Sequence, residues 1–262
     1  MQKKMKLKFF ENNQERWDAE KKLRYKVAKC IEIRPNSKVL DVLVGYADFS
    51  RAIAKIHNVK VMAIEIVEED IKEAKVKVKK EGLQNKVKII KMDATDMKFP
   101  DESFDYVVNF IGWEDLIVFS GREAIEKVFS EMSRVLKKNG LLLITFIPEV
   151  RPKNFVERKD IELERFMWSG TKRFLPKNSF LKLFKKYNIK LIEERRIQTN
   201  KNRIRPEDAK GLIKWMCKNY PKWSPKAKIR RYPEIIEKFG DFIEKYGMHS
   251  SFQVIVLIGK KV

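Results

Sequence analysis

Residues 39–50, VLDVLVGYADFS, contain the pattern that indicates the fold class most clearly. A run of apolar, largely β-branched residues ends close to Gly45, which predicts a short strand followed by a turn. Phe49, Ile53 and Ile56 then recur at helical spacing. The local structure expected here is therefore strand, turn and helix.

The same alternation continues along the chain. Further apolar runs predict strands at 59–66, 86–93, 104–110, 141–147, 189–198 and 251–259. Amphipathic segments separate most of them, including one at 68–81 and one that Asn139-Gly140 would end. Strands joined by helices give an α/β fold with a doubly wound, mainly parallel sheet, because parallel neighbours need crossover connections.

The regular alternation of predicted strands and helices ends after Pro148. A polar stretch at 151–175 precedes a helix near 177–187, and about fifty residues separate the last two strands. Those residues, 199–249, mix aromatic and cationic side chains and predict a basic helical insertion or cap. We therefore expect an N-terminal helical segment at 1–37, a main domain at 38–198 and 250–262, and a cap at 199–249.

Three carboxylates fall at the ends of the first three predicted strands. Asp41 ends the first strand before Gly45, Glu65 ends the second, and Asp93 ends the third. Small turn residues let a ligand approach the backbone, the next helix offers free N–H groups, and a carboxylate can hold ribose hydroxyls. One acid at a strand end is more often a turn or helix cap, but this ordered set predicts a nucleotide site.

The stretch 39–50 resembles motif I of the class I S-adenosylmethionine-dependent methyltransferases, usually VLDxGxGxGxxS. VMAIEIVEEDIKEAK, MDATDMKFPDESFDYVV and EMSRVLKKNGLLLITF continue the resemblance over residues 36–147. The group that is most similar is the ubiquinone/menaquinone-biosynthesis type. The resemblance implies a Rossmann-like seven-stranded sheet whose last strand is antiparallel, and S-adenosylmethionine as the cofactor.

The resemblance also assigns cofactor-binding residues. Asp41 and Gly45 would line the methionine moiety, Glu65 would hold the ribose hydroxyls, and Asp93 with Ala94 would contact the adenine. Ala47 in the turn and Asn109 at the end of the fourth strand complete the expected set.

The motif departs from the family pattern at two positions. Leu43 replaces the first glycine and Ala47 the third, so that only Gly45 remains. Ala47 adds a methyl group where the backbone should approach the cofactor closely. A dinucleotide dehydrogenase fits less well still, because it expects three glycines in G-x-G-x-x-G.

The acceptor side is expected after strand four, in Asn109-Phe110-Ile111-Gly112-Trp113-Glu114-Asp115. Trp113 is predicted as a wall of the acceptor pocket, with Glu114 or Asp115 as a base or orienting group. The alternative is that Trp113 packs beneath the cap and the two acids cap a helix. Asn109 lacks the Pro-Pro-aromatic continuation typical of amino-directed nucleic-acid methyltransferases.

The formal net charge is +22, and residues 40–150 carry 17 Lys/Arg against 19 Asp/Glu, so the excess lies in the flanks. The basic flanks predict an anionic partner, either a small anionic acceptor or RNA, and the alternative is a lysine-rich surface that serves solubility. A non-catalytic subunit that kept the fold is a third alternative. The sequence leaves the oligomeric state open.

Other classes are excluded by composition. Two cysteines and two histidines support neither a disulfide framework nor a zinc site, so no metal is expected. No apolar run is long enough to span a membrane, and the N-terminus lacks the pattern of a secretory signal. These features predict a cytoplasmic protein.

Overall fold

The computed structural model describes residues 14–149, 151–198, 203–223, 227–249 and 253–262. Residues 1–13 of the expected N-terminal segment lie outside this range, as do residues 199–202 and 224–226 of the expected cap. No helix in the described part of the chain is long and apolar enough to cross a membrane.

Seven strands form one sheet in the order β3-β2-β1-β4-β5-β7-β6. Their bounds are β1 Val39–Val42, β2 Val61–Glu65, β3 Val87–Lys91, β4 Phe104–Val108, β5 Leu136–Phe146, β6 Ile189–Gln198 and β7 Gln253–Lys261. The first five strands pair in parallel, whereas β7 is antiparallel to both β5 and β6. The predicted Rossmann-like sheet with an antiparallel last strand is confirmed.

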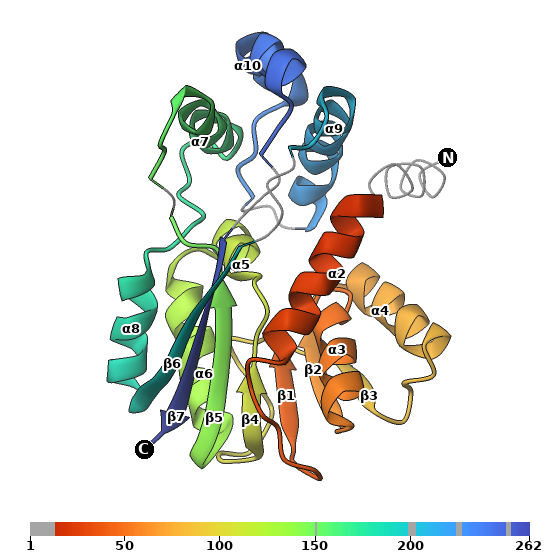
Figure 1. The fold of residues 1–262 in the computed structure, drawn as a ribbon, viewed down its shortest axis with the longest axis vertical. Helices are drawn as coiled ribbons and strands as arrows, with labels where there is room; N and C mark the ends of the chain where they lie inside the picture. The colour runs from red at the N-terminus through yellow and green to blue at the C-terminus, as the bar shows by residue number, and fades with distance from the viewer. Residues whose placement is uncertain (1–13, 150, 199–202, 224–226, 250–252) are drawn as a thin grey trace.

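Helices cover both faces of the sheet (Figure 1). On one face α2 (Gln14–Ala28), α3 (Asp48–His57) and α4 (Glu68–Lys80) contribute to one buried cluster. On the other, α5 (Trp113–Ser120), α6 (Glu123–Val135) and α8 (Lys177–Lys186) contribute to a second. Every residue of β1 is buried, because a parallel strand between two helical layers has no solvent face.

One predicted boundary is wrong. The helix expected to run to Asn139-Gly140 ends at Val135, and β5 begins directly at Leu136. Asn139 has a positive φ of 63°, and the pairing of β5 with β4 shifts register between Phe104 and Tyr106. The Asn-Gly pair therefore lies in an irregular part of the strand, since both residue types tolerate unusual backbone angles.

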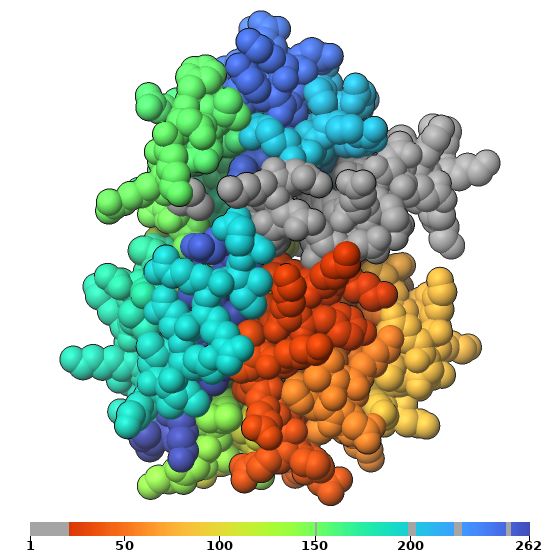
Figure 2. Space-filling view, viewed as in Figure 1, coloured from red at the N-terminus to blue at the C-terminus, as the bar shows by residue number. Residues whose placement is uncertain are grey.

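Three helices group at one end of the sheet, beyond α5 (Figure 1). They are α7 (Phe155–Met167), α9 (Pro206–Trp223) and α10 (Tyr232–Tyr246), and we call them the cap. The cap has its own buried cluster, which includes Leu163, Ile213 and Phe239. In the space-filling view the cap stands as a lobe above the sheet domain (Figure 2).

The expected cap range, 199–249, contains α9 and α10 but not α7, which precedes β6 in the chain. Arg203 ties the two parts together, because its guanidinium donates to both carboxylate oxygens of Asp160 on α7 at 2.7 and 2.8 Å. Ile204 and Met248 also form a bridge at the base of the insertion. The cap is thus assembled from two separate segments of the chain.

Candidate functional site

The turn between β1 and α3 keeps the backbone of a glycine-rich loop. Leu43, Gly45 and Ala47 have positive φ angles of 61°, 51° and 54°. These are the three positions where the family pattern has glycine. Non-glycine residues adopt this left-handed region at a cost of roughly 1–2 kcal/mol each, so the two substitutions are accommodated without loss of the turn geometry.

The substituted side chains point into protein, and the remaining glycine faces open space. Ala47 is completely buried, and Leu43 is half-buried against the second cluster. Leu43 also abuts the start of α5, since a Cβ added to Gly112 would lie 3.4 Å from the Leu43 Cβ. By contrast, a Cβ added to Gly45 would meet nothing within 4 Å. A ligand can therefore approach the backbone at Gly45.

Glu65 connects the end of β2 to this turn. One of its carboxylate oxygens accepts a hydrogen bond from the Gly45 N–H at 2.8 Å. The other accepts from the N–H groups of Ile66 and Val67 at 2.8 and 3.1 Å. The side chain is therefore fixed beside the turn, and its oxygens retain lone pairs that could accept from a diol.

Asp41 lies beneath the turn. The Ser50 hydroxyl donates to its Oδ2 at 2.5 Å, whereas Oδ1 is buried and has no hydrogen-bond partner among the described residues. Burial raises the pKa of Asp41 to about 7, although the Ser50 hydrogen bond opposes the rise. A buried acceptor without a partner is costly, and a donor supplied by a ligand would relieve that cost.

Asn109 joins the ends of β1 and β4. Its Nδ2 donates to the carbonyl oxygens of Val42 and Ile111 at 3.0 and 2.7 Å. The residue is completely buried, and its Oδ1 has no partner in the described part of the chain. Asn109 thus holds the strand ends in place and offers a second unsatisfied acceptor close to the turn.

Asp93 and Ala94 follow β3, as predicted. The Asp93 side chain is exposed, and its Oδ1 accepts from both the N–H and the hydroxyl of Thr95 at 2.8 Å. Ala94 is buried in the second cluster. Asp93 therefore caps its own turn in this structure, which is the common role of an acid at this kind of position.

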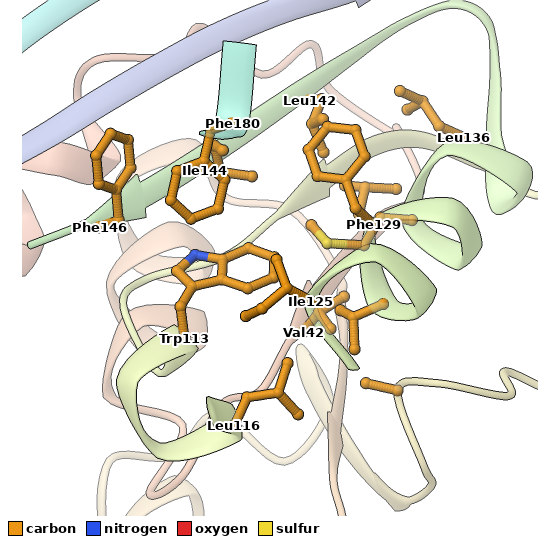
Figure 3. Close-up of a cluster of buried hydrophobic side chains, with 14 of the residues drawn as sticks. Val42, Trp113, Leu116, Ile125, Phe129, Leu136, Leu142, Ile144, Phe146 and Phe180 are labelled. Atoms are coloured by element: carbon orange, nitrogen blue, oxygen red, sulfur yellow. The ribbon is translucent and has the colours of Figure 1, made fainter. Parts of the chain in front are cut away.

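Trp113 lies in the core. It is 1% exposed, its indole N–H donates to the Thr145 carbonyl at 3.0 Å, and its ring packs edge-on against Phe180 (Figure 3). Figure 3 shows the ring among Ile125, Ile144 and Phe180. This placement favours packing over the expected role as a pocket wall.

Glu114 is also turned inward. Its carboxylate accepts from the N–H of Gly112 at 3.1 Å and, at 3.4 Å, from the N–H of Ile147. Burial raises the pKa of Glu114 to about 7, and the neighbouring Asp115 adds to the rise. The contacts are those of a group that fastens the start of α5, so the expected catalytic role of Glu114 stays a prediction.

Above α5, Asp115 contacts Tyr220 and Arg173, two residues that no sequence pattern groups with it. The Tyr220 hydroxyl of α9 donates to Asp115 Oδ1 at 3.3 Å, and Arg173 Nη2 lies 3.5 Å from the same oxygen. The Arg173 guanidinium also stacks over the ring of Trp168, 4.3 Å from its centroid. Asp115 had been considered as a base or a helix cap, but Arg173 and Tyr220 carry no motif that could have found them.

A shallow hollow of about 460 Å³, open to solvent, lies on the cap and not at the strand ends. Residues of α7 and α10 line it, together with Arg230 from the segment between α9 and α10. Arg230 and Lys238 each lie 4.4 Å from the centroid of the Phe166 ring. His249 lies elsewhere in the cap, near the Asp160–Arg203 pair, and burial lowers its pKa.

The strand order is that of a doubly wound α/β domain, a class that binds ligands at the carboxyl ends of its strands, and the turn at Gly45 lies at that end of β1. Residues 40–144 match a family model described as a methyltransferase domain. The resemblance to S-adenosylmethionine-dependent methyltransferases that the sequence predicts is therefore confirmed over this part of the chain.

Two curated relatives agree with this family. Sterol 24-C-methyltransferase ERG6B of Gibberella zeae is 32% identical over 146 residues, which are 55% of this chain and 37% of that protein. Demethylmenaquinone methyltransferase of Geobacillus stearothermophilus is 34% identical over 122 residues, 46% of this chain and 49% of the relative. The chain thus spans half or less of the length of each.

A solved structure matches the fold over more of the chain. A Bacillus halodurans protein assigned to the methyltransferases has a TM-score of 0.64, covering 91% of this chain and 98% of its own. The two sequences are 23% identical, so this likeness concerns the fold alone.

Proposed function

We propose that this protein transfers a methyl group from S-adenosylmethionine to a small acceptor bound beneath the cap. The observation that carries the proposal is the turn at 43–47, whose backbone keeps the left-handed conformation at all three motif positions despite two substitutions. This conformation leaves the backbone at Gly45 open, so that a ligand can approach it at the carboxyl ends of the strands.

The residues around the turn fit the cofactor. The open space at Gly45 accommodates a close ligand, the Glu65 carboxylate is oriented to accept from ribose hydroxyls, and Asp41 and Asn109 each present a buried acceptor without a partner. When bound, S-adenosylmethionine supplies a methyl group that is already activated on a sulfonium. The protein then contributes mainly position and exclusion of water.

The chemical class of the acceptor is a separate part of the proposal. The basic flanks predict an anionic acceptor, and the open hollow of the cap, lined by Arg165, Arg230 and Lys238 with one acid, Glu162, offers a place where an anionic group could bind. The RNA alternative gains no support from the relatives, which are named for sterol and quinone methylation. A cytoplasmic location stays a prediction.

Calorimetric titration with S-adenosylmethionine and S-adenosylhomocysteine, with NADH as the control ligand, tests the proposal. We expect micromolar binding of the first two and none of NADH. Absence of binding by either would refute the proposed activity and leave the non-catalytic subunit as the better account.

A matched pair of variants locates the site. Glu65→Ala should weaken S-adenosylhomocysteine binding by about 1.5–3 kcal/mol, the scale of hydrogen bonds to a charged group. Glu69→Ala, at an exposed carboxylate of α4, should leave the affinity unchanged. Equal affinities for the two variants would remove Glu65 from the cofactor site.

A further inference from the structure

The hollow of the cap lies between two of its helices. α7 and α10 lie side by side (Figure 1), and the segment between α9 and α10 contributes Arg230 to the lining. Phe166 and Phe239 form the aromatic part of the lining, with ring centroids 5.5 Å apart. The volume of about 460 Å³ is in the range of small-molecule sites. The hollow therefore combines an aromatic surface with enough space for a small ligand.

Cations outnumber acids in the lining. Arg165, Arg230 and Lys238 contribute three positive charges. Glu162 is the one acid among the described residues of the lining, and its carboxylate accepts a hydrogen bond from Lys159 at 2.7 Å. Lys159 itself is not part of the lining. Since the acid already has a cationic partner outside the hollow, the lining keeps an excess of positive charge.

Two of these cations have little internal pairing. Lys238 is exposed and has no carboxylate partner in the part of the chain that the structure describes. The Arg230 side chain is 41% exposed and lies 3.6 Å from Glu234, a carboxylate that also accepts from Arg231 at 2.5 Å. Arg230 Nε has no hydrogen-bond partner among the described residues. A guanidinium with unused donors can bind an anion without giving up a strong internal pair.

One aromatic ring holds both cations in place. Arg230 and Lys238 each lie 4.4 Å from the centroid of Phe166, within the range of a cation–π contact. The two charges are therefore closer together than the Debye length of about 10 Å at 0.1 M salt, and they repel each other. An anion that contacts both would replace this repulsion with two attractive contacts.

The turn after α7 leaves backbone open beside these side chains. Ser169 and Gly170 line the hollow and have positive φ angles of 49° and 82°. A Cβ added to Gly170 would meet nothing within 4 Å, so a ligand can approach the backbone there. The backbone N–H of Arg230 donates to the Met167 carbonyl at 2.8 Å, which fixes Arg230 beside the same turn. The exposed Ser169 hydroxyl adds a neutral donor.

We propose that the hollow is a second ligand site, separate from the turn at Gly45, and that it binds the phosphate group of a small aromatic phosphate monoester. Such a group carries about 1.5 to 2 negative charges near pH 7 and three acceptor oxygens. It therefore suits three cations better than a carboxylate does, which has a single charge. The aromatic part of the ligand lies against Phe166 and Phe239. The inference specifies the anion for this hollow and does not depend on methyl transfer.

Calorimetry of the full chain at low salt with three probes tests the proposal. Phenyl phosphate carries both parts of the ligand, inorganic phosphate carries only the charge, and benzoate has a ring with a single charge. We expect phenyl phosphate to bind about tenfold more tightly than benzoate, the scale of one charge-assisted hydrogen bond, and more tightly than inorganic phosphate. Benzoate or inorganic phosphate binding as tightly as phenyl phosphate, or no binding of any probe, would overturn the assignment.

A matched pair of lysines on α10 locates the site. Lys238→Gln should weaken phenyl phosphate binding about fivefold, the upper end for an exposed ion pair. Lys245→Gln removes the same charge from an exposed position outside the lining and should leave the affinity unchanged. Arg230→Gln should weaken binding at least as much as Lys238→Gln. An equal loss for the two lysine variants would mean that general attraction to the basic cap, and not the hollow, binds the probe.

Membrane lipids present the same phosphate chemistry. Cosedimentation with phosphatidylglycerol vesicles separates that source from a soluble ligand, and we expect Lys238→Gln and the unmodified protein to sediment equally. Vesicle binding that Lys238→Gln abolishes, without binding of phenyl phosphate, would assign the hollow to a membrane surface and overturn the proposal. S-adenosylhomocysteine is titrated separately, so failure of the cofactor site would leave this one standing, and the reverse.

Discussion

The turn at 43–47 has left-handed backbone angles at all three motif positions, although only Gly45 is a glycine. Leu43 and Ala47 take the left-handed backbone because their side chains gain buried contacts that offset the strain. Gly45 has no such compensation available, since a Cβ there would meet only open space. The surviving glycine is thus the position where a side chain would gain nothing and would obstruct a ligand.

Gly45→Ala should therefore destabilise the protein by about 1–2 kcal/mol, the cost of the left-handed region for a residue with a Cβ. Gly211→Ala is the matched control, because its added Cβ also meets nothing within 4 Å but the residue lies inside α9. That control should stabilise the protein by about 0.5–1 kcal/mol. Urea unfolding measures both, and effects of the same sign would contradict the argument.

Asp41 gives the folded protein a pH dependence. Its pKa is raised to about 7 in the folded state, whereas an unfolded Asp titrates near pH 4. Between these values the folded state binds more protons, so the free energy of unfolding should fall as the pH rises from 5 to 7 and level off above. Glu114, also raised to about 7, contributes in the same direction.

Asp41→Asn removes one of these two groups. We expect the loss of stability between pH 5 and 8 to shrink in this variant, by on the order of 2 kcal/mol. Denaturant unfolding at several pH values is the measurement. A variant with the same pH profile as the unmodified protein would mean that Asp41 is not the titrating group.

Among the helices and strands, the sequence predicted those whose apolar residues form a local pattern of buried positions. All seven strands and the turn at Gly45 were predicted, because buried parallel strands appear as apolar runs with turn residues between them. The start of β5 was missed because Lys137, Lys138 and Asn139 interrupt its apolar pattern. Helix α7 falls within the stretch that the sequence marks as polar, because charged residues separate its apolar ones, which pack in the buried cluster of the cap.

The candidate site likewise has residues that the sequence predicts and residues whose placement depends on tertiary packing. Glu65, Asp41 and Gly45 lie together because each is at or just beyond the carboxyl end of a strand, and the spacing in the sequence predicts that much. The inward orientation of Trp113 and Glu114, and the meeting of Asp115 with Tyr220, depend on how α5 and the cap pack. Tertiary contacts between segments 105 residues apart leave no local signal in one sequence.

The junction between α7 and the insertion provides a test of the cap. Asp160→Asn leaves Arg203 without its charged partner, and Asp160 is only 9% exposed. The loss should be about 1–3 kcal/mol, and it should appear as faster amide exchange in α9 and α10 but not in β4 or β5. Lys159→Gln, which removes an exposed pair with Glu162 on the same helix, should change exchange very little. Uniformly faster exchange throughout the chain would mean that cap and sheet unfold together.

For the whole molecule, charge has two different distributions. The chain carries a formal net charge of +22, whereas residues 40–150 carry 17 Lys/Arg against 19 Asp/Glu. The excess of lysine and arginine therefore belongs to the two flanks of the chain, which include the cap. Such a charge also destabilises the folded state through repulsion between like charges.

Salt should consequently stabilise this protein. Raising NaCl from 0.02 to 0.2 M shortens the range of electrostatic interactions to below about 10 Å, which relieves repulsion more than it weakens surface ion pairs of small net value. We expect Tm to rise by about 2–4 °C, which corresponds to about 1 kcal/mol for a chain of this size. The matched variant reverses three exposed lysines, with Lys88→Glu, Lys190→Glu and Lys222→Glu. This variant should have a higher Tm than the unmodified protein at low salt, and its Tm should rise less when NaCl is added. If the Tm of the unmodified protein falls with salt, attractive ion pairs dominate its surface and the prediction is wrong.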